Sequence, residues 1–208
     1  EAGMILAGVN LELLLALITF CAVTLITPGP NNIMLMTSGL NFGVRRTHPH
    51  LLGVALGFGV MVLLIGLGIG RIFSAYPVAH VVLNYAGASY LLYLAWAIAN
   101  SGPIATDGTQ TSKPLTFLQA AAFQWVNPKA WVMAIGAATT YAAIAPFPWS
   151  AGVMAALFAS LGLVSSGLWV LCGQGLSRVL STPRAVRLFN RVMALLLVAS
   201  LYPVLWDF

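Results

Sequence analysis

The chain has 208 residues, of which 60% are hydrophobic and 6% charged, and its mean hydropathy is +0.95. A soluble globular domain of this size cannot hide so much apolar surface, so the composition excludes one and indicates an integral membrane protein embedded in the lipid bilayer. The formal charge of +5 does not point to nucleic acid, because the basic residues mostly fall in short stretches between apolar segments.

Apolar stretches of about 20 residues or more predict membrane-spanning helices, because the strands of a β-barrel would alternate polar and apolar residues. Six spans are expected: Leu11–Leu40, Leu51–Gly70, Val78–Asn100, Leu115–Ala143, Ser150–Gly173 and Ala185–Leu205. The first and the fourth are longer than a crossing of about 30 Å requires. The sequence therefore predicts an all-α membrane protein of six transmembrane helices, with helices one and four discontinuous.

The first predicted break is the run Thr27–Asn32, with the sequence TPGPNN. Pro28 and Pro30 remove two backbone donors, and Pro30 also disfavours helical geometry in the residue before it. Proline is well suited to the first turn of a helix, so Asn31 and Asn32 are expected at a new helix N-terminus. The exposed N–H groups and partial positive charge of such an end attract an anion.

The second predicted break lies in the run Trp125–Trp131, near the middle of the fourth span. Asn127 is a good N-cap and Pro128 a good first residue for a restarting helix. Lys129 adds a full positive charge at the same place. An ammonium group at that depth of a membrane is costly and indicates a functional site.

Three spans in each half require that any internal repeat be inverted. We expect one transporter domain over residues 1–208, with a first three-helix repeat at 11–100, a cytoplasmic linker at 101–114 and a second repeat at 115–205. Weak sequence support comes from Pro28 and Pro128, and from Leu56-Gly57 and Leu161-Gly162, which lie about 100 residues apart. Two broken helices at matching positions are typical of a transporter whose binding site lies between repeats.

A pocket formed by two helix N-termini, a lysine and several amides is suited to a carboxylate. Carbonyls released at the breaks, together with amide side chains, are suited to an ammonium group, so a zwitterionic amino acid is the natural ligand. The predicted substrate-binding residues are Pro28, Gly29, Pro30, Asn31, Asn32, Gln124, Asn127, Pro128 and Lys129. A purely architectural alternative stays open, in which Lys129 pairs with a carbonyl and the prolines only bend the helices.

Basic residues indicate the orientation. Arg45 and Arg46 follow the first span, Lys113 follows the third, and Arg178, Arg184, Arg187 and Arg191 cluster between the fifth span and the start of the sixth. By the positive-inside rule these connections face the cytoplasm and both termini face outward. Arg71 is the one basic residue on the opposite side.

The two motifs carry a family resemblance. The runs Thr27–Asn32, Gly43–Arg46 and Asn127–Ala130, over a chain of this length and hydropathy, resemble the LysE/RhtB family of bacterial amino-acid exporters. The resemblance implies export of amino acids or their derivatives across the bacterial inner membrane, driven by the proton-motive force, with a homodimer as the assembly. It places the family motifs on Pro28, Gly29, Pro30 and Asn31, and on Asn127, Pro128 and Lys129.

Proton coupling is less clear from the residues, because no span interior contains a carboxylate. Lys129 is one candidate for proton exchange, and the lack of an acid favours a neutral substrate over a cationic one. His48 and His50 flank Pro49; a pH gate is conceivable there, but the pattern favours an interfacial location. No group of Cys, His and carboxylates indicates a metal site or a cofactor.

Several other functions are weighed against export of amino acids. A membrane thiol-redox carrier needs paired cysteines, but Cys21 maps onto about Ala121 and Cys172 has no cysteine counterpart. An intramembrane enzyme would need a base beside Ser165 or Ser166, and none is near in the sequence. A divalent-cation exporter would need buried acids. An exporter of another small metabolite remains open.

Overall fold

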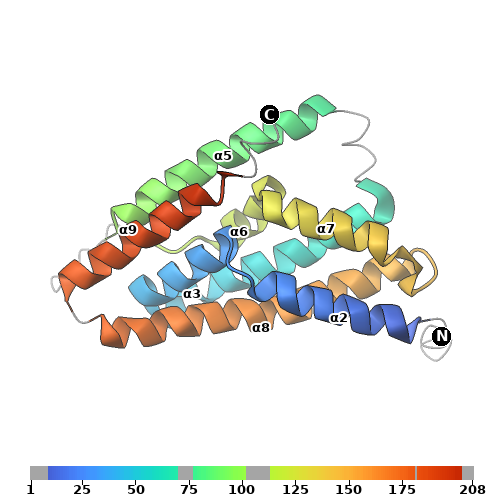
Figure 1. Ribbon diagram of the computed structural model, residues 1–208, viewed down its shortest axis with the longest axis horizontal. Coiled ribbons are helices and arrows are strands. Elements are labelled where there is room, and N and C mark those ends of the chain that lie inside the picture. The colour runs from blue at the N-terminus through green and yellow to red at the C-terminus, as the bar shows by residue number, and fades with distance from the viewer. Residues whose placement is uncertain (1–8, 70–76, 102–112, 181, 203–208) are drawn as a thin grey trace.

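The computed structural model describes residues 9–69, 77–101, 113–180 and 182–202, and these contain helices and no strand (Figure 1). The α-helices are α2 (Leu11–Ile26), α3 (Pro30–Leu64), α5 (Pro77–Ala99), α6 (Phe117–Phe123), α7 (Pro128–Thr140), α8 (Trp149–Val179) and α9 (Pro183–Ala199). Shorter turns are the π-helical η1 (Ile65–Ile69) and the 3₁₀ turns η2 (Gln124–Val126) and η3 (Ala142–Ile144). The predicted linker falls largely outside the described residues, as does Arg71.

Both predicted breaks are present. The helix α2 ends at Ile26, the backbone is extended at Thr27 and Gly29, and α3 begins at Pro30. In the fourth span, η2 ends at Val126, Asn127 is extended, and α7 begins at Pro128. In each case a proline occupies the first turn of the restarting helix, where its missing N–H costs nothing.

The connection expected between the first two spans, residues 41–50, lies within helix α3. Helix α3 turns at Gly43, whose φ of 74° and ψ of 169° interrupt it, and helical geometry resumes at once. A positive φ is accessible to glycine without steric cost, so one residue reverses the chain and no loop is needed. Arg45 and Arg46 therefore lie in a helix. We call residues 30–42 the first arm of α3 and residues 44–64 its second arm; Figure 1 shows α3 running outward and then back.

Three helical stretches within the described residues are long and apolar enough to cross a membrane: Pro30–Ile69, which includes the turn at Gly43, Val81–Ala99 and Trp149–Val179. The outward-facing side chains are also apolar, as lipid contact requires. Leu118 is 75% exposed, Val132 72% and Leu195 69%. The protein is therefore a helical membrane protein, and the division into six spans remains a prediction.

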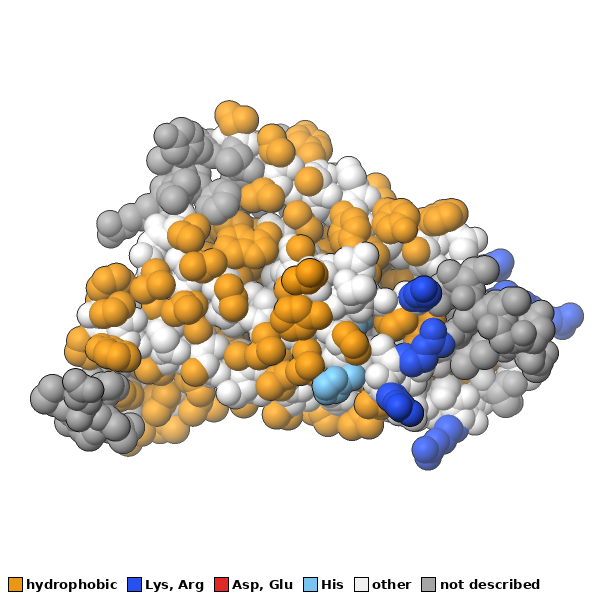
Figure 2. Space-filling model, turned by 180° about the vertical axis from the view of Figure 1, so that it is seen from behind, with side chains coloured by type: hydrophobic (Ala, Val, Ile, Leu, Met, Phe, Trp, Pro, Cys, Tyr) orange, Lys and Arg blue, Asp and Glu red, His pale blue; other side chains and the backbone are white. Residues whose placement is uncertain are grey.

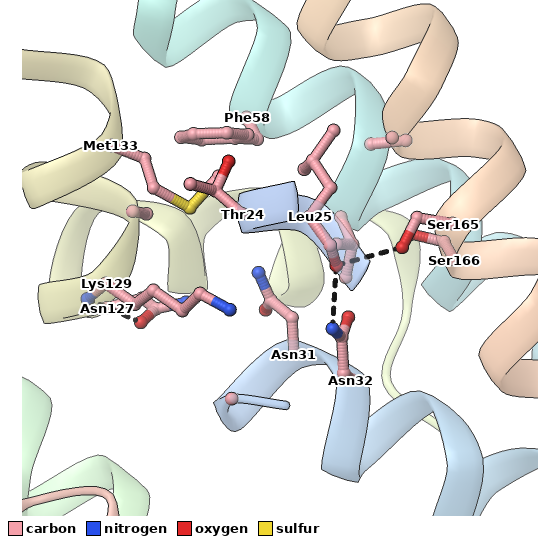
Figure 3. A pocket seen from close by; sticks show the side chains of 15 residues that line it. Thr24, Leu25, Asn31, Asn32, Phe58, Asn127, Lys129, Met133, Ser165 and Ser166 are labelled. Carbon is pink, nitrogen blue, oxygen red and sulfur yellow. Dashed lines mark hydrogen bonds between the residues drawn. The ribbon is translucent and has the colours of Figure 1, made fainter. Parts of the chain in front are cut away.

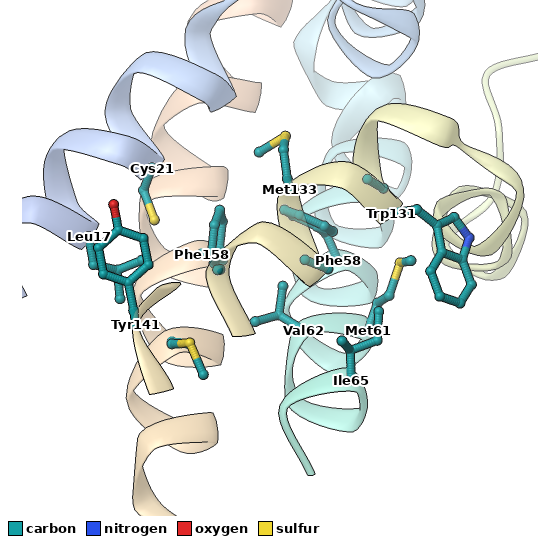
Figure 4. Packing of buried hydrophobic residues seen from close by; sticks show 14 of the residues in the cluster. Leu17, Cys21, Phe58, Met61, Val62, Ile65, Trp131, Met133, Tyr141 and Phe158 are labelled. Carbon is teal, nitrogen blue, oxygen red and sulfur yellow. The ribbon is translucent and has the colours of Figure 1, made fainter. Parts of the chain in front are cut away.

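Buried apolar side chains form two main clusters. The first joins α2, the second arm of α3, α7 and α8 (Figure 4), and its centre includes Phe58 and Phe158 with ring centroids 5.2 Å apart. The second joins the first arm of α3 to α5, α6 and α9 through residues such as Ile33, Phe123 and Leu197. Each arm of α3 thus belongs to one of the two main clusters, and a smaller cluster that includes Leu35 and Val54 joins the arms.

Glycines bring several helices into backbone contact. A Cβ added to Gly173 would overlap the backbone of Met36 and Leu40, so α8 crosses the first arm of α3 without space for a side chain. On the second arm, Gly53 and Gly57 contact α6 in the same way. The small-xxx-small spacing of Gly53 and Gly57 suits such close packing of helices.

We expect Gly173→Ala to lower the midpoint of thermal unfolding in detergent, because the methyl group must separate two backbones at a cost of about 1–3 kcal/mol. Gly167→Ala, on the same helix, is the matched control, since no atom lies within 4 Å of an added Cβ there. Alanine at that position should be neutral or slightly stabilising. Equal midpoints for the two variants would contradict the packing argument.

Candidate functional site

The two breaks contact each other. The Lys129 Nζ donates a hydrogen bond to the Thr27 carbonyl oxygen at 2.6 Å. A Cβ added to Gly29 would lie 2.8 Å from Lys129 Cδ and 3.2 Å from its Nζ, so the lysine side chain lies directly on the backbone of the first break. The start of α7 is therefore placed against the gap between α2 and α3.

A pair of amide side chains joins the breaks a second time. Asn31 Nδ2 donates to Gln124 Oε1 at 2.8 Å, and Gln124 Nε2 donates back to Asn31 Oδ1 at 3.2 Å. Gln124 Nε2 also donates to the Ala120 carbonyl oxygen at 2.9 Å, and the Gln124 side chain is fully buried. These bonds fix the start of α3 relative to the end of α6.

Carbonyl groups that the first break releases are satisfied by side chains. Asn32 Nδ2 donates to the carbonyl oxygens of Leu25, at 2.8 Å, and Thr27, at 2.9 Å. Ser165 Oγ, from α8, donates to the Leu25 carbonyl at 2.9 Å. A lipid environment offers no replacement donor, so these bonds make the break tolerable. The Thr27 carbonyl also lies at the negative end of α2, which favours the Lys129 ammonium group.

The two restarting helices differ in how their first amides are capped. Asn127 Oδ1 accepts from Lys129 N at 3.1 Å, so Asn127 is the N-cap of α7, as predicted. Gly29 is the N-cap of α3 and provides no side-chain hydrogen bond. The start of α3 is thus the helix end whose first N–H groups have no side-chain cap, which leaves it suited to an anion.

A narrow cavity lies where the breaks meet (Figure 3). The space left inside it is about 40 Å³, enough for a few water molecules and too small for an amino acid. Among the described residues, Lys129 is the one charged side chain that lines it. The lining residues are Thr24, Leu25, Gly29, Asn31, Asn32, Val54, Ala55, Phe58, Asn127, Lys129, Ala130, Met133, Gly162, Ser165 and Ser166.

All nine predicted substrate-binding residues lie at the two breaks. Gly29, Asn31, Asn32, Asn127 and Lys129 line the cavity. The other four do not line it: the three prolines interrupt the helices, and Gln124 forms hydrogen bonds with the Asn31 side chain.

Sequence reasoning missed the contributions of the second arm and of α8. Phe58, Ser165 and Ser166 line the cavity, and both serines are buried. From the sequence, these serines were expected at most as nucleophiles of an intramembrane enzyme. The available signal was a pair of adjacent hydroxyl groups inside an otherwise apolar span.

The partner predicted for the Lys129 ammonium group is a substrate carboxylate beside helix N-termini. In this structure the ammonium group donates to the Thr27 carbonyl at the end of α2. The architectural alternative, pairing with a carbonyl, is thus present in this structure. The Trp131 indole stabilises the second break, because its Nε1 donates a hydrogen bond to the Trp125 carbonyl at 2.7 Å.

The remaining reactive side chains lie elsewhere. Cys21 is buried, Cys172 is exposed, and both are free thiols. Over the described ranges, no group of three His, Cys, Asp or Glu side chains is placed to hold a metal ion. His48 is exposed, whereas His50 is only 1% exposed and packs inside the protein; their interfacial location in the membrane stays a prediction. The His80 side chain lies outside the described residues.

Comparison with known proteins gives one family. The LysE type translocator model matches residues 22–200. Curated relatives include the cysteine/O-acetylserine efflux proteins of Escherichia coli (strain K12), Shigella flexneri serotype 5b (strain 8401) and Shigella sonnei (strain Ss046). Each is 37% identical over 191 residues, which cover 89% of this chain and 94% of the relative. No solved structure gives a significant match. The chain belongs to the LysE type translocator family.

Proposed function

We propose that this protein exports small neutral amino acids or their derivatives across the bacterial inner membrane by alternating access. One observation carries the proposal: in the part of the chain that the structure describes, Lys129 is the one charged side chain lining a cavity at the junction of two broken helices. Charged side chains inside membranes mark substrate and ion pathways, and broken helices form the binding sites of many transporters.

The present hydrogen bonds suggest how a zwitterion is held. The substrate carboxylate accepts hydrogen bonds from the Lys129 ammonium group and from the uncapped N–H groups at the start of α3. The substrate ammonium then replaces Lys129 Nζ on the Thr27 carbonyl, which now accepts at 2.6 Å. Each bond broken is replaced by a charge-assisted bond to the ligand, so binding leaves no carbonyl unpaired.

The lining favours a neutral side chain on the substrate. No carboxylate lines the cavity, so a cationic side chain would lack a partner there. Phe58 and Met133 provide apolar surface for a short side chain. The curated relatives are named for efflux of cysteine and O-acetylserine, whose side chains are uncharged; we extend this substrate class, without choosing a member, to the present chain.

Substrate entry requires that the helices around the cavity separate, since about 40 Å³ does not admit an amino acid. We propose that residues 11–100 and 115–205 form two inverted three-helix repeats of one transporter domain, joined by a cytoplasmic linker at 101–114. One repeat rocks against the other. The proton-motive force drives the cycle, and a homodimer is the proposed assembly.

The basic residues support an orientation. Figure 2 shows Lys and Arg side chains gathered at one end of the visible face. By the positive-inside rule we assign that end to the cytoplasm, with both termini outside. Export then carries substrate from the basic end to the opposite one.

Replacing Lys129 with alanine is expected to reduce exchange of radiolabelled amino acids in proteoliposomes by about 10- to 100-fold, since a charged hydrogen bond contributes about 1.5–3 kcal/mol. Arg184→Ala, an exposed change at the start of α9, is the control and should exchange at the wild-type rate. Wild-type flux in Lys129→Ala would contradict the proposed site, and no flux of any amino acid by wild type would contradict the substrate class.

The Asn31 and Gln124 side chains are expected to act as one unit. Asn31→Ala and Gln124→Ala should each weaken substrate exchange, and the double variant should be little worse than either, because each single change already breaks the reciprocal amide pair. The measurement is a double-mutant cycle: the rate of amino-acid exchange is compared between wild type, the two single variants and the double variant. Strictly additive losses would mean that the two amides contribute independently.

Export requires no thiol chemistry. The double variant Cys21→Ala, Cys172→Ala should therefore retain amino-acid exchange in proteoliposomes, whereas a thiol-redox carrier would lose all activity. The buried Cys21 and the exposed Cys172 are both free in the structure. Complete loss of flux by a double variant that still assembles correctly would favour the redox alternative.

A further inference from the structure

A second cavity lies apart from the first, between the two arms of α3, the end of α5 and the segment before α6. The space left inside it is about 100 Å³, more than in the substrate cavity. Its polar lining includes Ser38, Asn41, His50, Ser101 and Lys113. Proposed substrate binding uses none of these side chains.

His50 is the unusual member of this lining. Its side chain is 1% exposed, and its Nδ1 lies 3.2 Å from Ser38 Oγ across the Gly43 turn. Its Nε2 is buried and has no hydrogen-bond partner within the described part of the chain. A buried nitrogen without a partner costs about 1–3 kcal/mol, so its retention beside a cavity indicates that it binds something.

The proposed ligand of His50 is a proton, because the chain has few carboxylates that could carry one. The four carboxylates are Glu1, Glu12, Asp107 and Asp207; Glu12 lies at the end of the first predicted span and the other three lie outside the predicted spans. Histidine is the side chain whose charge ordinarily changes between pH 5 and 8. We propose that His50 binds the coupling proton, which adds to the Nε2 lone pair and leaves from the same atom. This inference rests on the proposed export function.

The electrostatic surroundings make the proton-bound state dependent on conformation. The charged groups on the elements around this cavity are cationic, and of these only Lys113 lines it. The others are Arg45 and Arg46 on α3, Arg178 on α8, and Arg184, Arg187 and Arg191 on α9. His48 on α3 and the α5 tyrosines Tyr85, Tyr90 and Tyr93 do not line it either, and α6 has no ionisable group. Among the described residues, an imidazolium here has no anionic partner and needs oxygen acceptors, so proton binding favours a rearranged cavity.

The first arm of α3 links this rearrangement to substrate. Ser38 lies on that arm, which begins with Asn31 and Asn32 at the substrate cavity. With its lone pair on Nε2, neutral His50 already donates from Nδ1 to Ser38 Oγ; protonation keeps that bond, while Nε2 becomes a donor that needs a new acceptor. The relative position of the two arms then depends on whether the proton is bound. Substrate and proton thus both act on the position of the first arm of α3.

The test separates proton drive from substrate movement. Wild type, His50→Gln and the control His48→Gln are reconstituted in proteoliposomes and assayed for amino-acid counterflow and for accumulation driven by a pH gradient. Glutamine keeps hydrogen-bonding capacity but cannot bind the proton. His50→Gln should retain counterflow while its accumulation falls to the level measured without a gradient. His48→Gln, changed at an exposed position on the same helix, should match wild type in both assays.

Two outcomes overturn the inference. One is that His50→Gln accumulates substrate under a pH gradient as well as wild type does; the other is that a correctly assembled His50→Gln loses counterflow along with accumulation.

If His50→Gln does not assemble, the variant Ser38→Ala is measured instead, because it leaves the imidazole in place. It should shift the pH at which accumulation is half-maximal and keep counterflow, and an unchanged pH profile overturns the inference. Absence of counterflow in wild type would instead overturn the proposed export function.

Discussion

The structure depends on how the interrupted helices satisfy their backbone carbonyls. Lipid supplies no hydrogen-bond donor, so a helix that stops inside the membrane must find donors within the protein. Lys129, Asn32 and Ser165 supply them to the Thr27 and Leu25 carbonyls. These three side chains come from α7, α3 and α8, so satisfying one break draws three helices together and creates the cavity.

The same donors explain why the junction suits a charged substrate. Each of the bonds is polar and replaceable, and the ammonium and carboxylate of an amino acid present the complementary groups. Lys129 Nζ occupies the place that the proposed function assigns to the substrate ammonium. The apolar clusters on either side, one on each arm of α3, hold the surroundings in place. The first arm then connects this cavity to the His50 cavity.

Features that follow from local chemistry were predictable. Proline cannot continue a helix, so the breaks before Pro30 and Pro128 and the capping by Asn127 followed from a few adjacent residues. The turn between the first two predicted spans depends on a positive φ at Gly43, and the residues around a glycine give no sign of whether the chain turns or continues there. The burial of His50 was not predictable, because Ser38 reaches it only through that turn and the rest of its cavity comes from other segments.

The sequence by itself determined that this chain is a helical membrane protein, where its helices break, and that a lysine lies at one break. Those properties depend on hydropathy and on backbone chemistry, which act over a few residues. Only the tertiary structure decided that Lys129 binds the Thr27 carbonyl, that Asn31 pairs with Gln124, and that Ser165 completes the site from α8. These contacts join residues about 90 to 140 positions apart, and helix packing alone sets which of them meet.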